Sequence, residues 1–515
     1  MLKQKLILSY SSKFLVQILQ MVAGIVVGRI AGPSVLGTVS YATAFVSMFL
    51  FVADLGISTA HMKFLSEGRD RGKCITAFTY LKFVSMGLFS VVVIGAFLLK
   101  KHLFNSPFES DIHEQAIWIS FIAILLNELY NIPRTTFAAF TEQAKQDIPQ
   151  LINGILFQII RIVVVILGFG AVEILLGRLA SLLVLLPLFI YLFKDYKFGA
   201  LDKALIKDYM RISVPVIFIG MSTMMIGQVD KVFIQELTNN SEQVGFYSAG
   251  FSFGGFILLI SNSVGLIFFP LFSQAVVRGD YDYISEKIQR FERFSLIYIM
   301  PGVTLLAIFS EPLILVTMGI DFMPSIPIMI TITFSMFVMV LNMPYGNVIT
   351  GTGNFVLAAY INMANLLFFG LSMYFFIATL ELNALGAALG VLCSNLFIGL
   401  LYRYHAKQKC KQIVFSATVP HMIFGLLGFV LFQFLYTNYF SEPFLSSYGA
   451  LEYLWKVAGK LSFFTVAFLI YSWGGMYLLK LLDKSDIDDI SNIIDVKSLL
   501  SYVKGELKKD KDDKA

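Results

Sequence analysis

Ionisable side chains near the middle of long apolar runs are the residues of this chain that could do chemistry. Asp54, Glu128 and Arg161 each lie well inside such a run. A charge at the centre of a bilayer costs on the order of 2.5 to 3.5 kcal/mol, so each residue needs a partner or water. A carboxylate in that position could exchange a proton, and an arginine could hold a phosphate through two parallel hydrogen bonds. A purely structural ion pair between Arg161 and Glu128 is the alternative.

Two candidate sets follow from these residue types. Basic side chains could bind an anionic ligand, and this set comprises Arg161, Arg178, Arg29, Lys231 and Lys13. Acidic side chains could exchange a coupling ion, and this set comprises Asp54, Glu128 and Asp230. The alternative for Arg29 and Lys231 is that their long side chains reach the lipid headgroups. With Glu173 included, the five basic and four acidic residues favour an anionic ligand only slightly.

Small and polar residues form stripes within several apolar runs. In residues 38–65, Ser40, Ser47, Asp54 and His61 recur every seven residues and therefore share one face of a helix. Comparable stripes occur in 5–30, 209–235 and 244–273. A polar stripe is costly against lipid, so these helices are expected to turn it toward a shared, water-accessible cavity. Ordinary helix packing through small residues is the alternative for the serines and glycines.

The composition identifies the elements that must position these residues. The chain has 515 residues, of which 57% are hydrophobic and 14% charged, and its mean hydropathy is +0.76. A soluble fold cannot bury that much apolar surface, whereas a helix of about 20 apolar residues crosses a bilayer. The sequence therefore predicts an all-α polytopic membrane protein with about fourteen transmembrane helices.

The expected spans are read from the apolar runs. In the first half they are residues 5–30, 38–65, 74–99, 115–138, 148–169, 171–193 and 209–235. In the second half they are residues 244–273, 291–310, 326–350, 354–379, 383–406, 416–437 and 456–482.

The connections between spans alternate in charge. Lys and Arg gather in 63–73, 194–211, 278–293 and 403–411, whereas 236–243, 311–325, 380–384 and 438–455 hold acids but no Lys or Arg. Basic connections face the cytoplasm in membrane proteins, so both termini are expected to be cytoplasmic. The net charge of +5 is read as this topology signal, and no nucleic-acid partner is expected.

A weak internal repeat suggests how the spans are grouped. Shifting the sequence by 208 positions places Leu36 and Gly37 on Val244 and Gly245. Two pseudo-symmetric lobes of six helices around a central cavity are therefore expected, related by an axis along the membrane normal. The predicted division is residues 1–208 for the N-lobe and cytoplasmic linker, 209–411 for the C-lobe, 412–482 for two extra C-terminal helices and 483–515 for a cytoplasmic tail. That tail is either an interfacial amphipathic helix or a solvated, disordered segment.

The sequence offers no catalytic signature. The GTG at residues 351–353 lacks the Lys and Ser/Thr of a phosphate-binding loop, and the five histidines and three cysteines show no metal-ligand spacing. The chain is therefore expected to be no enzyme and to use neither a cofactor nor a metal.

Two stretches carry a resemblance to a known family. They are GRIAGPSVLGTVSYATAFVSMFLFVADLGI at residues 28–57 and VDKVFIQELTNNSEQVGFYSAGF at residues 229–251, the second followed by FFPLFSQ at residues 268–274. The chain resembles the oligosaccharide flippases of the Wzx type, which export O-antigen, teichoic acid and related glycans. Those flippases belong to the multidrug/oligosaccharidyl-lipid/polysaccharide (MOP) exporter superfamily, together with multidrug and toxin extrusion antiporters and lipid II flippases.

The resemblance implies a function as well as a fold. Its substrate would be an oligosaccharide on undecaprenyl pyrophosphate, carried from the cytoplasmic to the outer leaflet of the cytoplasmic membrane by alternating access. Implied partners are this lipid-linked oligosaccharide, membrane lipids, a polysaccharide polymerase and glycosyltransferases. Two alternatives stay open: an ion-coupled drug or cation antiporter, which would need a negatively charged cavity, and a membrane scaffold in a polysaccharide assembly complex.

Overall fold

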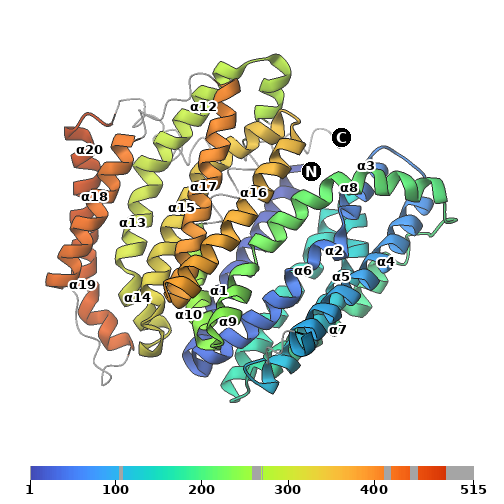
Figure 1. The fold of residues 1–515 in the computed structure, drawn as a ribbon, viewed down its shortest axis with the longest axis horizontal. Coiled ribbons are helices and arrows are strands. Elements are labelled where there is room, and N and C mark those ends of the chain that lie inside the picture. The colour runs from blue at the N-terminus through green and yellow to red at the C-terminus, as the bar shows by residue number, and fades with distance from the viewer. Residues whose placement is uncertain are drawn as a thin grey trace, which may run out of the picture.

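The computed structural model describes residues 2–103, 108–257, 268, 271–410, 419–440 and 450–482, and every regular element in these ranges is helical (Figure 1). The first part contains α1 (Leu2–Ser47), α2 (Leu50–Asp54), α3 (Ile57–Ser66), α4 (Arg71–Leu98), α5 (Asp111–Ala139), α6 (Gln143–Ile166) and α7 (Ala171–Phe193). The middle part contains α8 (Lys203–Ile226), α9 (Val229–Thr238), α10 (Ser241–Gly254), α12 (Tyr281–Phe294), α13 (Met300–Ile308), α14 (Ser310–Thr317), α15 (Ser325–Gly351), α16 (Phe355–Tyr374) and α17 (Asn383–Lys409). The last part contains α18 (Val419–Leu435), α19 (Ala450–Leu469) and α20 (Gly475–Leu478).

Eleven of the described helical segments are long and apolar enough to cross a membrane. They correspond to eleven of the expected spans, and the expected spans without a match are residues 38–65, 209–235 and 244–273. The first is interrupted by breaks in its helices, and the other two contain residues that lie wholly or in their side chains outside the described part of the chain. The all-helical membrane fold is therefore confirmed, whereas the number fourteen is not. The tail at 483–515 lies outside the described residues.

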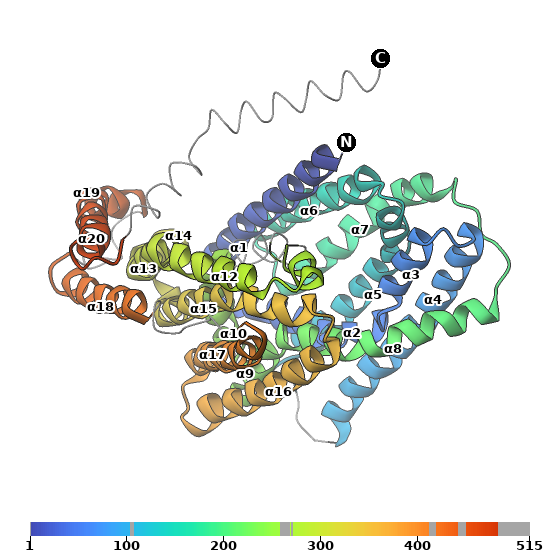
Figure 2. The ribbon, with the colours of Figure 1, turned by 90° about the horizontal axis from the view of Figure 1, so that it is seen from above.

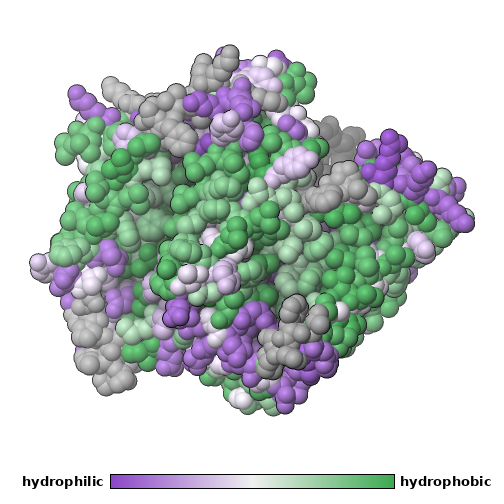
Figure 3. Space-filling view, viewed as in Figure 1, coloured by the Kyte–Doolittle hydropathy of each residue, from purple (hydrophilic) through white to green (hydrophobic). Residues whose placement is uncertain are grey.

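The surface has the apolar belt of a membrane protein. Figure 3 shows hydrophobic residues across the middle of one face, with hydrophilic residues gathered along its upper and lower edges. The turn between α3 and α4 and the start of α12 lie along the upper edge in Figure 1, and the junction of α9 and α10 lies along the lower edge. We call these edges the basic side and the acidic side, after the charges of their connections.

The first two expected spans are separated by a break inside α1. Gly32 has a φ of 80° there and Pro33 follows at once, within the connection expected between residues 30 and 38. Gly tolerates this backbone conformation, and Pro cannot donate the helical hydrogen bond, so the pair bends the chain on the acidic side.

A second break interrupts the expected span 38–65 where its acid lies. α2 ends at Asp54, Leu55 adopts a left-handed conformation with a φ of 47°, and Gly56 follows with a φ of 74° before α3 begins. A left-handed Leu is costly and persists only when its surroundings hold it there.

Two groups of helices meet along α1 and α10. We call α1 to α7 the N-terminal bundle and α8 to α17 the C-terminal bundle. Figures 1 and 2 show α2 to α5 on one side of α1 and α10 and α12 to α17 on the other, whereas α8 extends over to α2, α3 and α4. The helices α18 to α20 lie at the far edge of the C-terminal bundle, beside α13 and α14 (Figure 2). There Gly425 of α18 lies against Met300 of α13, and Phe424 stacks on Tyr471 at 4.9 Å.

The two bundles touch backbone to backbone on the acidic side. A Cβ atom at Gly37 of α1 would overlap the carbonyl oxygen of Ser241 in α10, and one at Gly245 would overlap that of Pro33. The 208-residue shift exchanges Gly37 with Gly245 and Pro33 with Ser241, so these two contacts are reciprocal, as a two-fold relation requires. The division of the chain into lobes at residues 208 and 411 stays a prediction.

Polar contacts reinforce this closure. The hydroxyls of Ser34 and Ser241 lie 3.1 Å apart, and Glu109, which precedes α5, accepts a hydrogen bond of 2.8 Å from the backbone N–H of Ser241. Tyr41 donates to Glu236 at 2.6 Å, and Lys100 also contacts this carboxylate. Carboxylates and hydroxyls thus join the bundles around the glycine contact.

The closed acidic side predicts a specific cross-link. Cysteines at Ser34 and Ser241 are expected to form a disulfide on mild oxidation, because their side chains already lie within bonding range of one another. The yield can be measured by gel shift in a background without Cys74, Cys393 and Cys410. Gly37→Val should lower the yield by separating the helices. The pair Ser34→Cys with Ser252→Cys is the control, since Ser252 is eleven residues, about 16 Å, further along α10. Equal yields from both pairs would contradict the contact.

Candidate functional site

A buried lysine joins the two acids that were predicted from the sequence. Lys82 of α4 is fully buried, and its Nζ donates to Asp54 Oδ1 at 2.9 Å and to Glu128 Oε2 at 3.0 Å. Lys82 lies eleven residues after the start of α4, roughly 16 Å along the axis and near the middle of a membrane span. An ammonium at this depth requires counter-charges, and α2 and α5 supply one each.

The break between α2 and α3 is part of the same cluster. The carbonyl of Ala53, left without a helical partner by the break, accepts from Lys82 Nζ at 3.2 Å and from Ser85 Oγ at 2.8 Å. The hydroxyl of Ser58, in the first turn of α3, donates to Asp54. The cluster therefore satisfies both the charge of the lysine and the backbone of the interrupted helix.

The cluster continues along α5 into a cavity. Asn131 Nδ2 donates to Glu128 Oε2 at 3.2 Å, and Arg134 Nη2 donates to Asn131 Oδ1 at 2.8 Å. Asp54, Glu128, Asn131 and Arg134 all line a cavity of about 340 Å³. The side chain of Asp54 is 22% exposed and that of Glu128 is 8% exposed, so the cavity reaches the triad chiefly at Asp54.

Lys82 and Arg134 are functional candidates that the sequence reasoning missed. A signal was available, because Lys82 lies well inside the apolar run 74–99, as Asp54 lies inside its own. Glu128, Asn131 and Arg134 are also spaced at three residues, which places them along one side of a helix.

The predicted basic residues lie in different surroundings and do not form one site. Glu128 is paired with Lys82 and not with Arg161, so the structural pair considered as an alternative does not form. Arg161 has a buried Nε without an acceptor among the described residues. Gly177 of α7 packs on Ile160 of α6, which brings Arg161 and Arg178 to the same level of neighbouring helices. Neither arginine is among the residues that line the 340 Å³ cavity.

The remaining candidates lie closer to the acidic side or elsewhere in the chain. Arg29 Nη1 donates to the carbonyls of Val316 at 2.7 Å and Thr317 at 3.2 Å, at the end of α14. Its guanidinium therefore joins the bundles and caps a helix terminus. The side chain of Lys13 lies outside the described residues.

Asp230 and Lys231 are neighbours at the start of α9. Tyr247 donates to Asp230 Oδ2 at 2.6 Å, and Lys231 Nζ lies 3.4 Å from Asp230 Oδ1. Asp230 is buried and well supplied with donors, and its role in ion exchange stays a prediction.

A second charged cluster, unforeseen from the sequence, lies in the C-terminal bundle. Arg403 Nη2 and the hydroxyl of Tyr345 each donate to Glu292 Oε1 at 2.8 Å, and Arg403 Nη1 donates to Asn342 at 3.1 Å. It pairs one carboxylate with one guanidinium, whereas the first cluster has two carboxylates for one ammonium. No group of three or more His, Cys, Asp or Glu side chains that could hold a metal ion occurs in the described part of the chain.

Comparison with known sequences identifies the family. The family described as "Polysaccharide biosynthesis protein" matches residues 26–327. The chain belongs to this family. Its sequence has no match among curated proteins.

Solved structures with the same fold are transporters. An inward-facing multidrug-resistance MATE family transporter of the MOP superfamily has a TM-score of 0.64 at 15% identity, over 77% of this chain and 96% of that one. The lipid II flippase MurJ, in an inward closed conformation, has a TM-score of 0.64 at 14% identity, over 91% and 99% of the two chains. An outward-facing MATE transporter has a TM-score of 0.54 at 14% identity, over 80% and 96%. This family member therefore has the MOP transporter fold that the resemblance implied.

The triad predicts how stability responds to charge removal. Lys82→Met leaves two buried carboxylates without their cation and is expected to cost about 3–5 kcal/mol, seen as a lower apparent unfolding temperature in detergent. Adding Asp54→Asn and Glu128→Gln to this variant should recover most of the loss, because the uncompensated charges are then removed. Lys197→Met, at an exposed lysine, is the control. An Lys82→Met protein as stable as the wild type would show that the triad carries no buried charge.

Proposed function

We propose that this chain is a flippase that carries a lipid-linked oligosaccharide, bound through its pyrophosphate, across the cytoplasmic membrane. The cavity that combines Arg134 with an acid pair at mid-membrane depth is the observation that carries the proposal. Membership of a polysaccharide biosynthesis family and a transporter fold support it. The carrier would be undecaprenyl pyrophosphate, and a polymerase and glycosyltransferases would act on either side of the step.

Arg134 suits a pyrophosphate better than the other arginines near the acids. Arg134 borders the cavity. In the described part of the chain its side chain donates one hydrogen bond, from Nη2 to Asn131. The other guanidinium N–H groups can form the paired hydrogen bonds that a phosphate accepts. Arg161 and Arg178 form a second cationic level on α6 and α7, where the substrate would pass later in the cycle.

Alternating access follows from the closed acidic side. We place the basic side in the cytoplasm by the charge of its connections, with both termini there. The bundles are then joined on the outer side, at Gly37 and Gly245, and the substrate would enter the cavity from within. Opening outward would break the contacts of Glu109, Tyr41 and Arg29 across the bundles.

Coupling to a proton is proposed at the triad. Two carboxylates share the charge of Lys82, and Arg134 reaches Glu128 through Asn131, so a proton on either acid would change the net charge of the cluster by one unit. Asp54 borders the cavity and adjoins the left-handed Leu55, so its protonation would act directly on the break between α2 and α3. Lys231, Lys13 and Asp230 keep the supporting roles expected from the sequence.

Drug or cation export is the second candidate function. The observation that favours it is Asp147 of α6, a buried carboxylate whose two oxygens have no hydrogen-bond partner among the described residues. Such a group could attract an organic cation.

Export of a surface polysaccharide tests the proposed function. Deleting the gene is expected to remove the polysaccharide, and the wild-type chain should restore it. Arg134→Ala and Arg161→Ala should each lower the restored amount at least about tenfold, the scale of one lost charge-assisted hydrogen bond. Arg161→Lys should keep part of the activity, and Arg29→Ala should be milder. Arg211→Ala, at an exposed arginine of α8, is the control, and immunoblots verify membrane insertion. Dye sensitivity with intact polysaccharide would instead support the cation exporter.

Proton coupling has its own test in proteoliposomes. Transport of the lipid-linked oligosaccharide that accumulates in the deletion strain is measured with and without a pH gradient. Asp54→Asn and Glu128→Gln should each flatten the dependence on the gradient, because each removes one of the two carboxyl groups that could take up the proton. Glu292→Gln is the matched control, since it removes a buried carboxylate that is paired one to one. A full gradient response in both triad variants would leave these acids as counter-charges only.

A further inference from the structure

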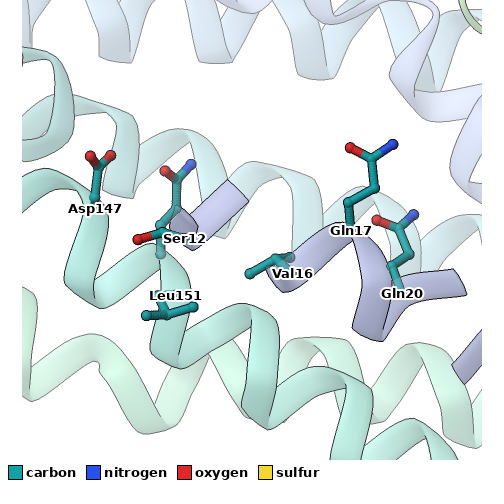
Figure 4. Close-up of a pocket in the computed structure, with 7 residues that line it drawn as sticks. Ser12, Val16, Gln17, Gln20, Asp147 and Leu151 are labelled. Carbon is teal, nitrogen blue, oxygen red and sulfur yellow. The ribbon is translucent and has the colours of Figure 1, made fainter. Parts of the chain in front are cut away.

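A second cavity, of about 280 Å³, lies between α1 and α6. Asp147 and Gln150 line it from α6, and Gln17 and Gln20 line it from α1. In Figure 4 the carboxylate of Asp147 and the amides of Gln17 and Gln20 are directed toward the same side of the two helices. Three amides and one carboxylate thus face a common space.

Asp147 is the unusual member of this group. It is only 2% exposed, and neither of its carboxylate oxygens has a hydrogen-bond partner in the described part of the chain. Asp54 and Glu128, by contrast, both accept from Lys82. A buried carboxylate without donors is costly. A ligand could supply the hydrogen-bond donors that Asp147 lacks.

The walls of the cavity are held at a fixed separation. Gly154 lies two turns after Asp147 on α6, and a Cβ atom there would be 2.7 Å from Val16 Cγ2 of α1. Val16 and Leu151 lie beneath the polar groups in Figure 4. The site therefore combines a small apolar floor with acceptors and donors above it.

This combination fits the chemistry of a sugar. Neighbouring hydroxyls on a sugar ring are donors for a carboxylate, the amides can both donate to and accept from the ring, and the C–H face of the ring suits an apolar floor. Among the lining residues in the described part of the chain, Asp147 is the one charged group. The carboxylate of an acidic sugar would meet the Asp147 carboxyl with no basic side chain among the lining residues to offset it, so the site favours a neutral sugar.

We propose that this cavity is a binding site for a neutral sugar residue of the substrate, with Asp147 accepting its hydroxyls and Gln17, Gln20 and Gln150 orienting it. This proposal rests on the flippase function: the 340 Å³ cavity would hold the pyrophosphate and the 280 Å³ cavity the sugar. Gln150 lines both cavities, so a pyrophosphate at Arg134 would leave the first sugars next to Asp147.

Three lipid probes test the site on the full chain in lipid nanodiscs. They are undecaprenyl pyrophosphate, the same lipid with one N-acetylhexosamine, and the same lipid with one hexuronic acid. The wild type is expected to bind the neutral-sugar probe at least about tenfold more tightly than the bare carrier, and the uronic-acid probe no more tightly than the bare carrier. Asp147→Asn should remove most of the neutral-sugar advantage and strengthen binding of the uronic-acid probe.

Two further variants keep the result interpretable. Gln17→Ala, at an exposed position of α1, should also reduce the neutral-sugar advantage, whereas Asn153→Ala is a matched control on α6 outside the cavity. An advantage that survives Asp147→Asn, or is lost equally in Asn153→Ala, overturns the sugar site. Equal binding of the three probes by the wild type overturns it too, although binding of the bare carrier would still support the flippase. If none of the probes binds, the proposed function itself fails.

Discussion

The need to neutralise an ammonium in the interior of a membrane bundle organises the N-terminal half of this protein. Lys82 is fully buried at about the middle of α4, and its charge is balanced by Asp54 on α2 and Glu128 on α5. Three helices are thereby held in one arrangement, and the interrupted backbone at Ala53 shares the same donor. The left-handed Leu55 beside this carbonyl is strained, and the ion cluster supplies contacts that hold it there.

The two bundles use buried charge differently. In the C-terminal bundle, Glu292 accepts hydrogen bonds from both Arg403 and Tyr345. In the N-terminal bundle, Lys82 contacts two carboxylates, and the cluster opens at Asp54 to a cavity that Arg134 also lines. A cluster that is closed off suits a structural role, whereas one that borders a cavity can exchange its contacts with water.

Closure of the acidic side depends on the absence of side chains at two glycines. At Gly37 and Gly245 there is no Cβ, and the backbones of α1 and α10 therefore approach until each glycine meets a carbonyl of the other helix. The polar contacts of Ser34, Tyr41 and Glu109 are arranged around this approach and are exchangeable for water. Such a contact is close and specific, yet its polar partners can exchange their hydrogen bonds for water.

Hydropathy alone determined the membrane class, the helical fold and most of the spans, because a bilayer leaves a chain no other way to satisfy its backbone. Asp54 and Glu128 were also identifiable in advance, since a charge within an apolar run is rare and expensive. The break at Gly32 lies in the expected connection between the first two spans, whereas the break at Leu55 was not predicted, because hydropathy windows average over single residues.

Only the tertiary structure decided which charges meet. Lys82 lies 28 residues from Asp54 and 46 from Glu128, and nothing in one sequence shows that these positions share a space. Arg161 was a candidate partner for Glu128 because both lie at mid-span, yet helix packing places Arg161 at the level of Arg178 and pairs Glu128 with Lys82. The cost of burying a charge depends on the residues around it in the sequence. Which charges pair depends instead on how each helix is rotated about its own axis, and that rotation is set by close packing between helices.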